Sequence, residues 1–101
     1  MTDTLAIMVS TRGALPHLLG LVEAARKRDL AVTIFFTGEG VLVTQEPGFA
    51  ALAGRAKMAL CEVSFRALGL KGDVPGIGYK DFATQARHAE MLEDFPHYLV
   101  L

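Results

Sequence analysis

Short apolar runs alternate with amphipathic segments along the whole chain. Largely apolar runs over residues 5–9, 30–36 and 57–60 predict strands that are covered on both faces. Residues 14–28 place leucine, valine and alanine at helical spacing, and the basic residues 26–28 close the last turn, where cations favour a helix end. The first third of the chain therefore predicts a strand, a helix and a second strand.

The middle of the chain predicts shorter elements. Residues 41–43 are apolar and fit either one or two turns of helix or a surface loop, and residues 49–53 are expected to form a short helix. Another helix is expected to begin directly after Cys61 and to end at Gly69.

The last third contains a glycine-rich loop over residues 71–78, of which residues 77–79 are expected to form a short fourth strand. Asp81 suits the N-cap of a helix whose apolar face would carry Phe82, Ala86, Ala89 and Leu92. Residues 98–101 predict a terminal strand.

Strands that alternate with helices predict a single α/β domain over residues 1–101, with a parallel sheet covered by helices. In such sheets the functional crevice lies beyond the carboxyl ends of the strands. We expect three segments to meet there: Ser10–Gly13, Thr37–Gly40 and Cys61–Ser64.

Composition narrows the function classes. The net charge of −1 provides no basic surface for nucleic acid, and no apolar run approaches the roughly 20 residues of a membrane span. Apolar residues make up 51% of the chain and the mean hydropathy is +0.35, which predicts a homo-oligomer because so small a domain leaves part of its apolar surface outside its own core. The beginning of the sequence lacks a basic segment typical of signal peptides, so we expect a cytoplasmic protein.

Cys61, the single cysteine, is the candidate for chemistry. A cysteine is often a small buried core residue, but one between a strand end and a helix start lies where amide N–H groups and the helix dipole favour a thiolate. Glu62 opposes a lowered thiol pKa if its carboxylate faces the sulfur, and it has no such effect if it points to solvent. The sequence leaves both alternatives open.

Spacing excludes several cysteine chemistries. Phosphatase and rhodanese loops require five residues between cysteine and arginine, whereas Cys61 and Arg66 are one residue closer. The segment Cys61–Ser64 has the C-x-x-S form of a one-thiol redox motif, but it follows a later strand than in thioredoxin-type folds. One cysteine and three scattered histidines (His17, His88 and His97) do not predict a zinc site, and surface positions are expected for these histidines.

The segment Thr37–Gly40, T-G-E-G, has two interpretations. It is either a tight turn or a phosphate-binding loop, although it lacks the Lys-Ser/Thr ending of a P-loop and the third glycine of a dinucleotide fingerprint. A flavodoxin-like nucleotide-binding domain therefore stays an alternative.

The sequence I-F-F-T-G-E-G-V over residues 34–41 resembles the strand-and-turn signature of the DsrE/DsrF/TusD-like sulfur-relay family. Two further segments fit the same order of elements: L-C-E-V-S over residues 60–64, and A-L-G-L over residues 67–70. The resemblance extends over essentially the whole chain.

This resemblance implies a three-layer α/β/α sandwich with a five-stranded, mainly parallel sheet, and oligomers that are often trimers or hexamers. It also implies that Cys61 carries sulfane sulfur as a persulfide, received from a sulfur-donor protein and passed to a sulfur-acceptor protein. We expect neither a cofactor nor a metal. The main alternative is a non-catalytic interaction module of the same fold, in which Cys61 is inert.

Overall fold

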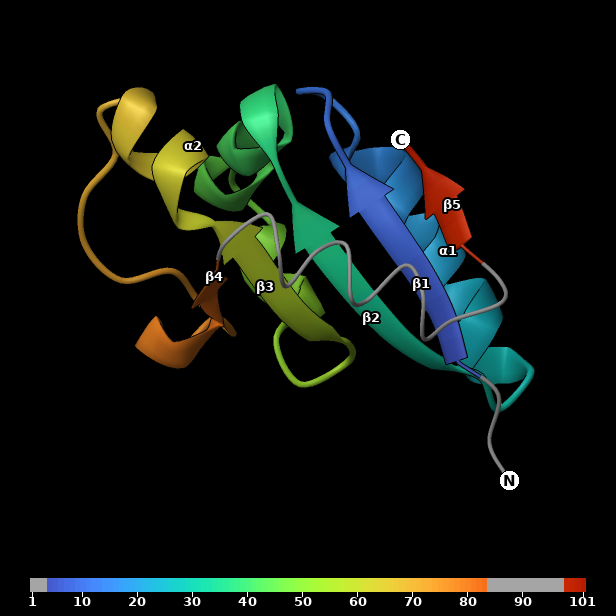
Figure 1. Ribbon diagram of the computed structural model, residues 1–101. Helices are drawn as coiled ribbons and strands as arrows, with labels where there is room; N and C mark the ends of the chain where they lie inside the picture. The colour runs from blue at the N-terminus through green and yellow to red at the C-terminus, as the bar shows by residue number, and fades with distance from the viewer. Residues whose placement is uncertain (1–3, 84–97) are drawn as a thin grey trace.

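The computed structural model describes residues 4–83 and 98–101. Within them, five strands form one parallel sheet in the order β4-β3-β2-β1-β5 (Figure 1). The strands are β1 (Thr4–Val9), β2 (Ala31–Phe36), β3 (Lys57–Cys61), β4 (Phe82–Ala83) and β5 (Tyr98–Val100). The predicted α/β class with a five-stranded parallel sheet is confirmed.

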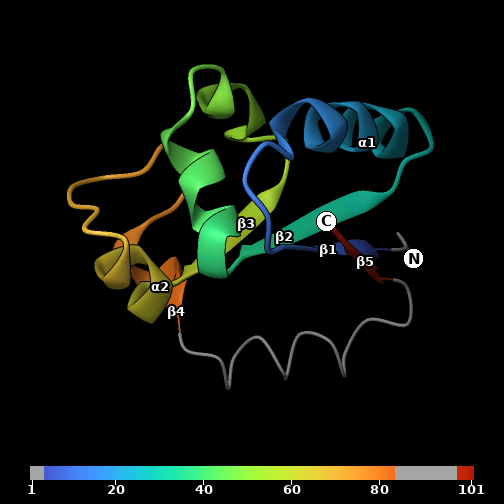
Figure 2. The same ribbon diagram turned by 90° about the horizontal axis from the view of Figure 1, so that it is seen from above.

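The helical elements are α1 (Leu15–Lys27) and α2 (Glu62–Ala67), together with three 3-10 segments, η1 (Gly38–Gln45), η2 (Phe49–Leu52) and η3 (Tyr79–Asp81). Figure 2 shows α1, η1 and η2 on one face of the sheet. Pro16 stands in the first turn of α1, where its missing N–H is tolerated, and basic residues occupy the last turn.

Alternation along the strands divides the side chains between two faces of the sheet. On the face toward α1, Ile7, Ile34, Phe36 and Leu60 are completely buried and belong to the main core. On the opposite face, which we call the second face, Phe35, Cys61 and Ala83 form a small separate buried cluster next to Ala59. The central strands therefore carry buried side chains on both faces, as their largely apolar runs predict.

The prediction of a helix beginning at Asp81 is wrong at its start, because Asp81 ends η3 and the next two residues form β4. The edge of β3 decides this, since Leu60 and Cys61 pair in parallel with Phe82 and Ala83. The other positions expected in that helix, Ala86, Ala89 and Leu92, lie outside the described residues.

The strand expected at residues 77–79 is also wrong. Val74 and Ile77 instead form an isolated bridge that closes the turn V-P-G-I, with the Ile77 N–H donating to the Val74 carbonyl at 3.1 Å. Proline and then a glycine with φ of +77° at the centre of the turn favour a type II geometry. Ile77 ends this turn and Tyr79 begins η3, so the chain does not extend over residues 77–79.

Candidate functional site

Cys61 is the last residue of β3 and the N-cap of α2, which is the position that the sequence predicts. Its side chain is 1% exposed. Because Cys61 pairs with Ala83 across β3 and β4, its side chain lies on the second face with Phe35, away from the main core. The structure thus places the thiol at the carboxyl edge of the sheet but buries it there.

The three segments expected to meet at this edge do so. The Thr37 N–H donates to the Val9 carbonyl at 2.9 Å, which joins the ends of β1 and β2. The Gly38 N–H donates to the Ser64 hydroxyl oxygen at 3.0 Å, which joins the turn after β2 to α2. Backbone and side-chain hydrogen bonds therefore connect β1, β2 and α2 around the carboxyl edge.

An exposed ion pair also bridges the first two segments. The Arg12 guanidinium donates to both Glu39 carboxylate oxygens, at 3.3 Å from Nε and 3.2 Å from Nη2. These hydrogen bonds, and then the charge attraction, lower the pKa of the Glu39 carboxyl and raise the pKa of Arg12. The ion pair is solvent-exposed, so it orients the two turns more than it stabilises them.

The glycines of the T-G-E-G turn have packing roles. Gly38 adopts φ of +54°, a conformation that favours glycine. A Cβ at Gly40 would lie 2.0 Å from the Val9 carbonyl oxygen, so only glycine allows this close approach of the two backbones. The Gly38 N–H is already bonded to Ser64, so this amide is not presented to a phosphate. The geometry favours the tight-turn interpretation.

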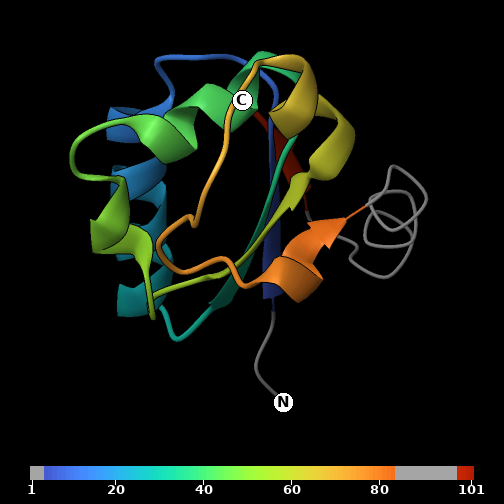
Figure 3. The ribbon, with the colours of Figure 1, turned by 90° about the vertical axis from the view of Figure 1, so that its left-hand side faces the viewer.

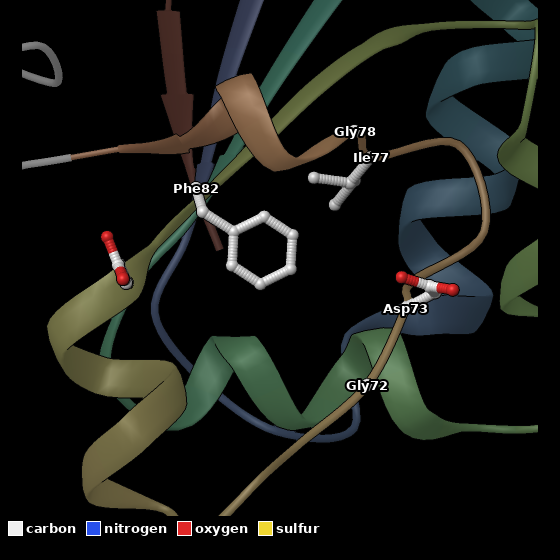
Figure 4. Close-up of a pocket in the computed structure, with 6 residues that line it drawn as sticks. Gly72, Asp73, Ile77, Gly78 and Phe82 are labelled. Carbon is white, nitrogen blue, oxygen red and sulfur yellow. The ribbon is translucent and has the colours of Figure 1, made fainter.

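The structure shows what the Glu62 carboxylate contacts, a point that the sequence leaves open. Its carboxylate pairs with Arg66 one helical turn later, at 2.6 Å. It also lines a pocket of about 610 Å³ together with Asp73, Ile77 and Phe82. Figure 4 shows the Phe82 ring and Ile77 side by side in this pocket, with Asp73 on the opposite wall. Of the two alternatives for Glu62, the structure favours an acid that faces solvent and its own helix.

The glycine-rich loop over residues 71–78 lies on the same side of the sheet as η1 and η2 (Figure 3). Val74 and Ile77 are buried in the main core, and a Cβ at Gly76 would lie 2.6 Å from the Met58 methyl group. The thiol of Cys61 belongs to the second face. This loop is therefore anchored on the side of the sheet opposite the Cys61 thiol.

Of the three histidines expected at the surface, one lies in the part of the chain that the structure describes. His17 lies in the first turn of α1 and is exposed, as expected. His88 and His97 lie outside the described residues. Among residues 4–83 and 98–101, no three His, Cys, Asp or Glu side chains are grouped so that they could hold a metal ion.

The sequence did not predict that Ser64 and Arg12 connect the turns at this edge. Ser64 appears there only as the end of a C-x-x-S motif, whereas the structure uses its hydroxyl to bind the turn after β2. Arg12 lies in the first predicted segment, but its pairing with Glu39 depends on how two turns approach in three dimensions. The sequence signal was that the three segments follow strand ends at the same edge of the sheet. It predicted that they lie close together but not which residues bond to each other.

Comparisons with protein-family models, with curated proteins and with solved structures gave no match. Within the part of the chain that the structure describes, none of the helices has the length and apolar character needed to cross a membrane. The resemblance to the sulfur-relay family stays a prediction.

Proposed function

We propose that this chain is a sulfur carrier that accepts sulfane sulfur as a persulfide on Cys61 and passes it to a partner protein. The observation that carries the proposal is the position of Cys61 at the carboxyl end of β3, where the turns after β1 and β2 converge. This edge is where parallel α/β sheets place their functional residues.

The transfer requires little machinery from the carrier itself. The Cys61 thiolate attacks the outer sulfur of a donor persulfide, R–S–SH. A new S–S bond forms at Cys61 while the donor's S–S bond breaks, and the donor leaves as the thiolate R–S⁻. Cys61 then holds S–SH, and no net oxidation or reduction occurs. A second attack by an acceptor thiolate returns Cys61 to its starting state.

The finer fold and the setting belong to the same proposal. Burial of Phe35, Cys61 and Ala83 on the second face supports a covering layer there, in line with a three-layer sandwich. We further propose a cytoplasmic homo-oligomer, trimeric or hexameric, with donor and acceptor proteins as partners and no nucleic acid.

Mass spectrometry of the intact protein tests the proposal directly. After incubation with a small-molecule persulfide and then with a persulfide-loaded sulfurtransferase, the wild-type chain should gain the mass of one sulfur atom. A reductant should remove it, and Cys61→Ser should gain nothing because the chain has no other cysteine. Unmodified wild-type protein with both donors, under conditions where a denatured sample reacts, would refute the carrier function.

A second candidate is a non-catalytic interaction module, favoured by the 1% exposure of Cys61. Large apolar side chains are exposed elsewhere: Val63 in α2, and Tyr98, Leu99 and Val100 on the edge strand β5. These side chains suit contacts between subunits. Sedimentation that gives a stable oligomer, combined with a Cys61 that neither accepts sulfur nor reacts in the native state, would favour this function over sulfur transfer.

A further inference from the structure

A pocket lies between the start of α2, the glycine-rich loop and β4, and we call it the Phe82 pocket. Its volume is about 610 Å³, and its walls are formed by Glu62, Gly72, Asp73, Ile77, Gly78 and Phe82. Pockets that bind small molecules usually have volumes of about 300–1,000 Å³. The Phe82 pocket is therefore large enough for a small organic molecule.

Phe82 and Ile77 provide the apolar surface of this pocket, and both pack with the main core. Figure 4 shows the Phe82 ring and the Ile77 side chain facing the open space, with Asp73 across it. The Phe82 ring is held in place by the edge-on contact with Phe65, whose ring centroid lies 5.0 Å away. A Cβ added at Gly72 or Gly78 would meet no atom within 4 Å, so these two lining positions leave room for a ligand.

The charged side chains among the described residues that line the Phe82 pocket are Glu62 and Asp73, and both are acidic. Glu62 is paired with Arg66, which lines the adjoining pocket of about 470 Å³. Asp73 is exposed, and none of the ion pairs among the described residues involves it. Carboxylates attract a cation, and so does the face of an aromatic ring such as Phe82. The two kinds of group in this pocket therefore favour the same ligand charge.

We infer that the Phe82 pocket binds a small organic cation, an ammonium group carried on an apolar stem. The stem packs on Phe82 and Ile77, and the ammonium group lies near the Asp73 and Glu62 carboxylates. A free small molecule fits this site because the pocket is concave and combines an apolar wall with few polar groups. The inference is independent of sulfur transfer, since the Cys61 thiol lies on the second face of the sheet.

NMR titration of the isotope-labelled full chain with phenethylammonium tests the inference. So small a ligand should bind with a Kd on the order of millimolar, and the largest amide shifts should fall on the residues that line the Phe82 pocket. Hydrocinnamate has the same phenyl stem and carries a carboxylate in place of the ammonium group. Because like charges repel, it should bind at least about tenfold more weakly. Phenethyl alcohol, which is neutral, should fall between the two.

Charge-changing variants at exposed positions test the electrostatic part. Asp73→Asn keeps the shape of the side chain and should weaken phenethylammonium binding about two- to fivefold. Arg66→Gln removes the cation that competes for Glu62, so it should tighten binding by a similar factor. Asp29→Asn is the matched control, because it removes the same charge from an exposed position just after α1 and should leave the Kd unchanged.

Phe82→Leu tests the contribution of the ring. It keeps an apolar side chain and should weaken binding of the ammonium compound about two- to fivefold while leaving that of phenethyl alcohol nearly unchanged. Urea titration shows whether each variant remains folded. The exposed positions 66 and 73 test the site without changing the core.

Equal Kd values for phenethylammonium and hydrocinnamate, or an unchanged Kd in Asp73→Asn, would overturn the inference. Amide shifts that spread over the surface and do not saturate would also overturn it. Acetyl-lysine methylamide that binds more tightly than phenethylammonium would overturn the assignment to a free small molecule, because it would place a lysine side chain of a partner protein in the pocket. Tighter binding of the ammonium compound, with opposite effects of Asp73→Asn and Arg66→Gln, supports the cation site.

Discussion

Gly40→Ala should be among the most destabilising single-atom additions available in this chain. Gly40 is buried, and the added Cβ would lie 2.0 Å from the Val9 carbonyl oxygen, 2.4 Å from its carbon and 2.9 Å from the Ser10 nitrogen. All three atoms belong to backbone, so no side-chain rotation relieves the overlap. The Val9 oxygen must retreat by about 1.5 Å to reach ordinary van der Waals separation.

That retreat breaks the 2.9 Å hydrogen bond from the Thr37 N–H to the Val9 carbonyl. Losing one such bond costs about 1 kcal/mol, and overpacking a tight site adds about 1–3 kcal/mol. The expected loss is therefore about 2–4 kcal/mol, or roughly 10–20 °C in Tm for a domain of this size. The loss in the free energy of unfolding should be visible as a lower urea midpoint when unfolding is followed by circular dichroism.

Gly20→Ala is the matched control because it adds the same atom with the opposite expected sign. Gly20 lies within α1, is exposed, and has no atom within 4 Å of its would-be Cβ. Alanine in a helix interior is favoured over glycine by about 0.5–1 kcal/mol. If the free energy of unfolding of Gly40→Ala lies within about 0.5 kcal/mol of the wild-type value, the close approach of the two backbones does not constrain this position and the reasoning fails.

The remaining predictions concern the ion pair and the anchored loop. Arg12→Gln should return the pKa of Glu39 toward its ordinary value, as followed by NMR titration of the Glu39 carboxyl. Because folding lowers that pKa, the stability difference between variant and wild type should exist above the unfolded-state pKa and vanish as pH falls through the lowered one; a difference that grows in acid would contradict the sign. Gly76→Ala should lose about 1–3 kcal/mol, since its φ is +77° and its Cβ would meet Met58 and Ala53; unchanged urea midpoints would show that the turn is not anchored there.

The central strands could be predicted because their apolar runs are long and buried on both faces, so local pattern and tertiary environment agree. The edge strand β4 could not, because two residues carry no periodicity and Phe82–Ala83 pair only because β3 offers them an edge. The burial of Cys61 was equally hidden. The alternation of side chains along β3 shows that Cys61 and Leu60 face opposite sides of the sheet. The sequence pattern does not show which of these sides carries the separate small cluster of Phe35, Cys61 and Ala83.

The site was predicted as a place rather than as a set of contacts. Three turns at the carboxyl edge follow from the order of strands and helices, and the structure brings them together. The bonds within that place depend on distances of a few tenths of an ångström between elements far apart in sequence. Arg12 and Glu39 are separated by 27 residues, and Gly38 and Ser64 by 26.

The pairing of β1 with β5 has a consequence for the order of folding. One side of β1 pairs with β2, which follows soon after in the chain, but the other side must wait for residues 98–101. The contact that completes this edge joins Ser10 to Leu101 across 91 residues. During synthesis β1 therefore keeps an open edge until residues 98–101 have emerged, and such edges recruit strands from other chains. Refolding at rising protein concentration should lose yield to aggregation earlier for a chain cut before Tyr98 than for the full chain.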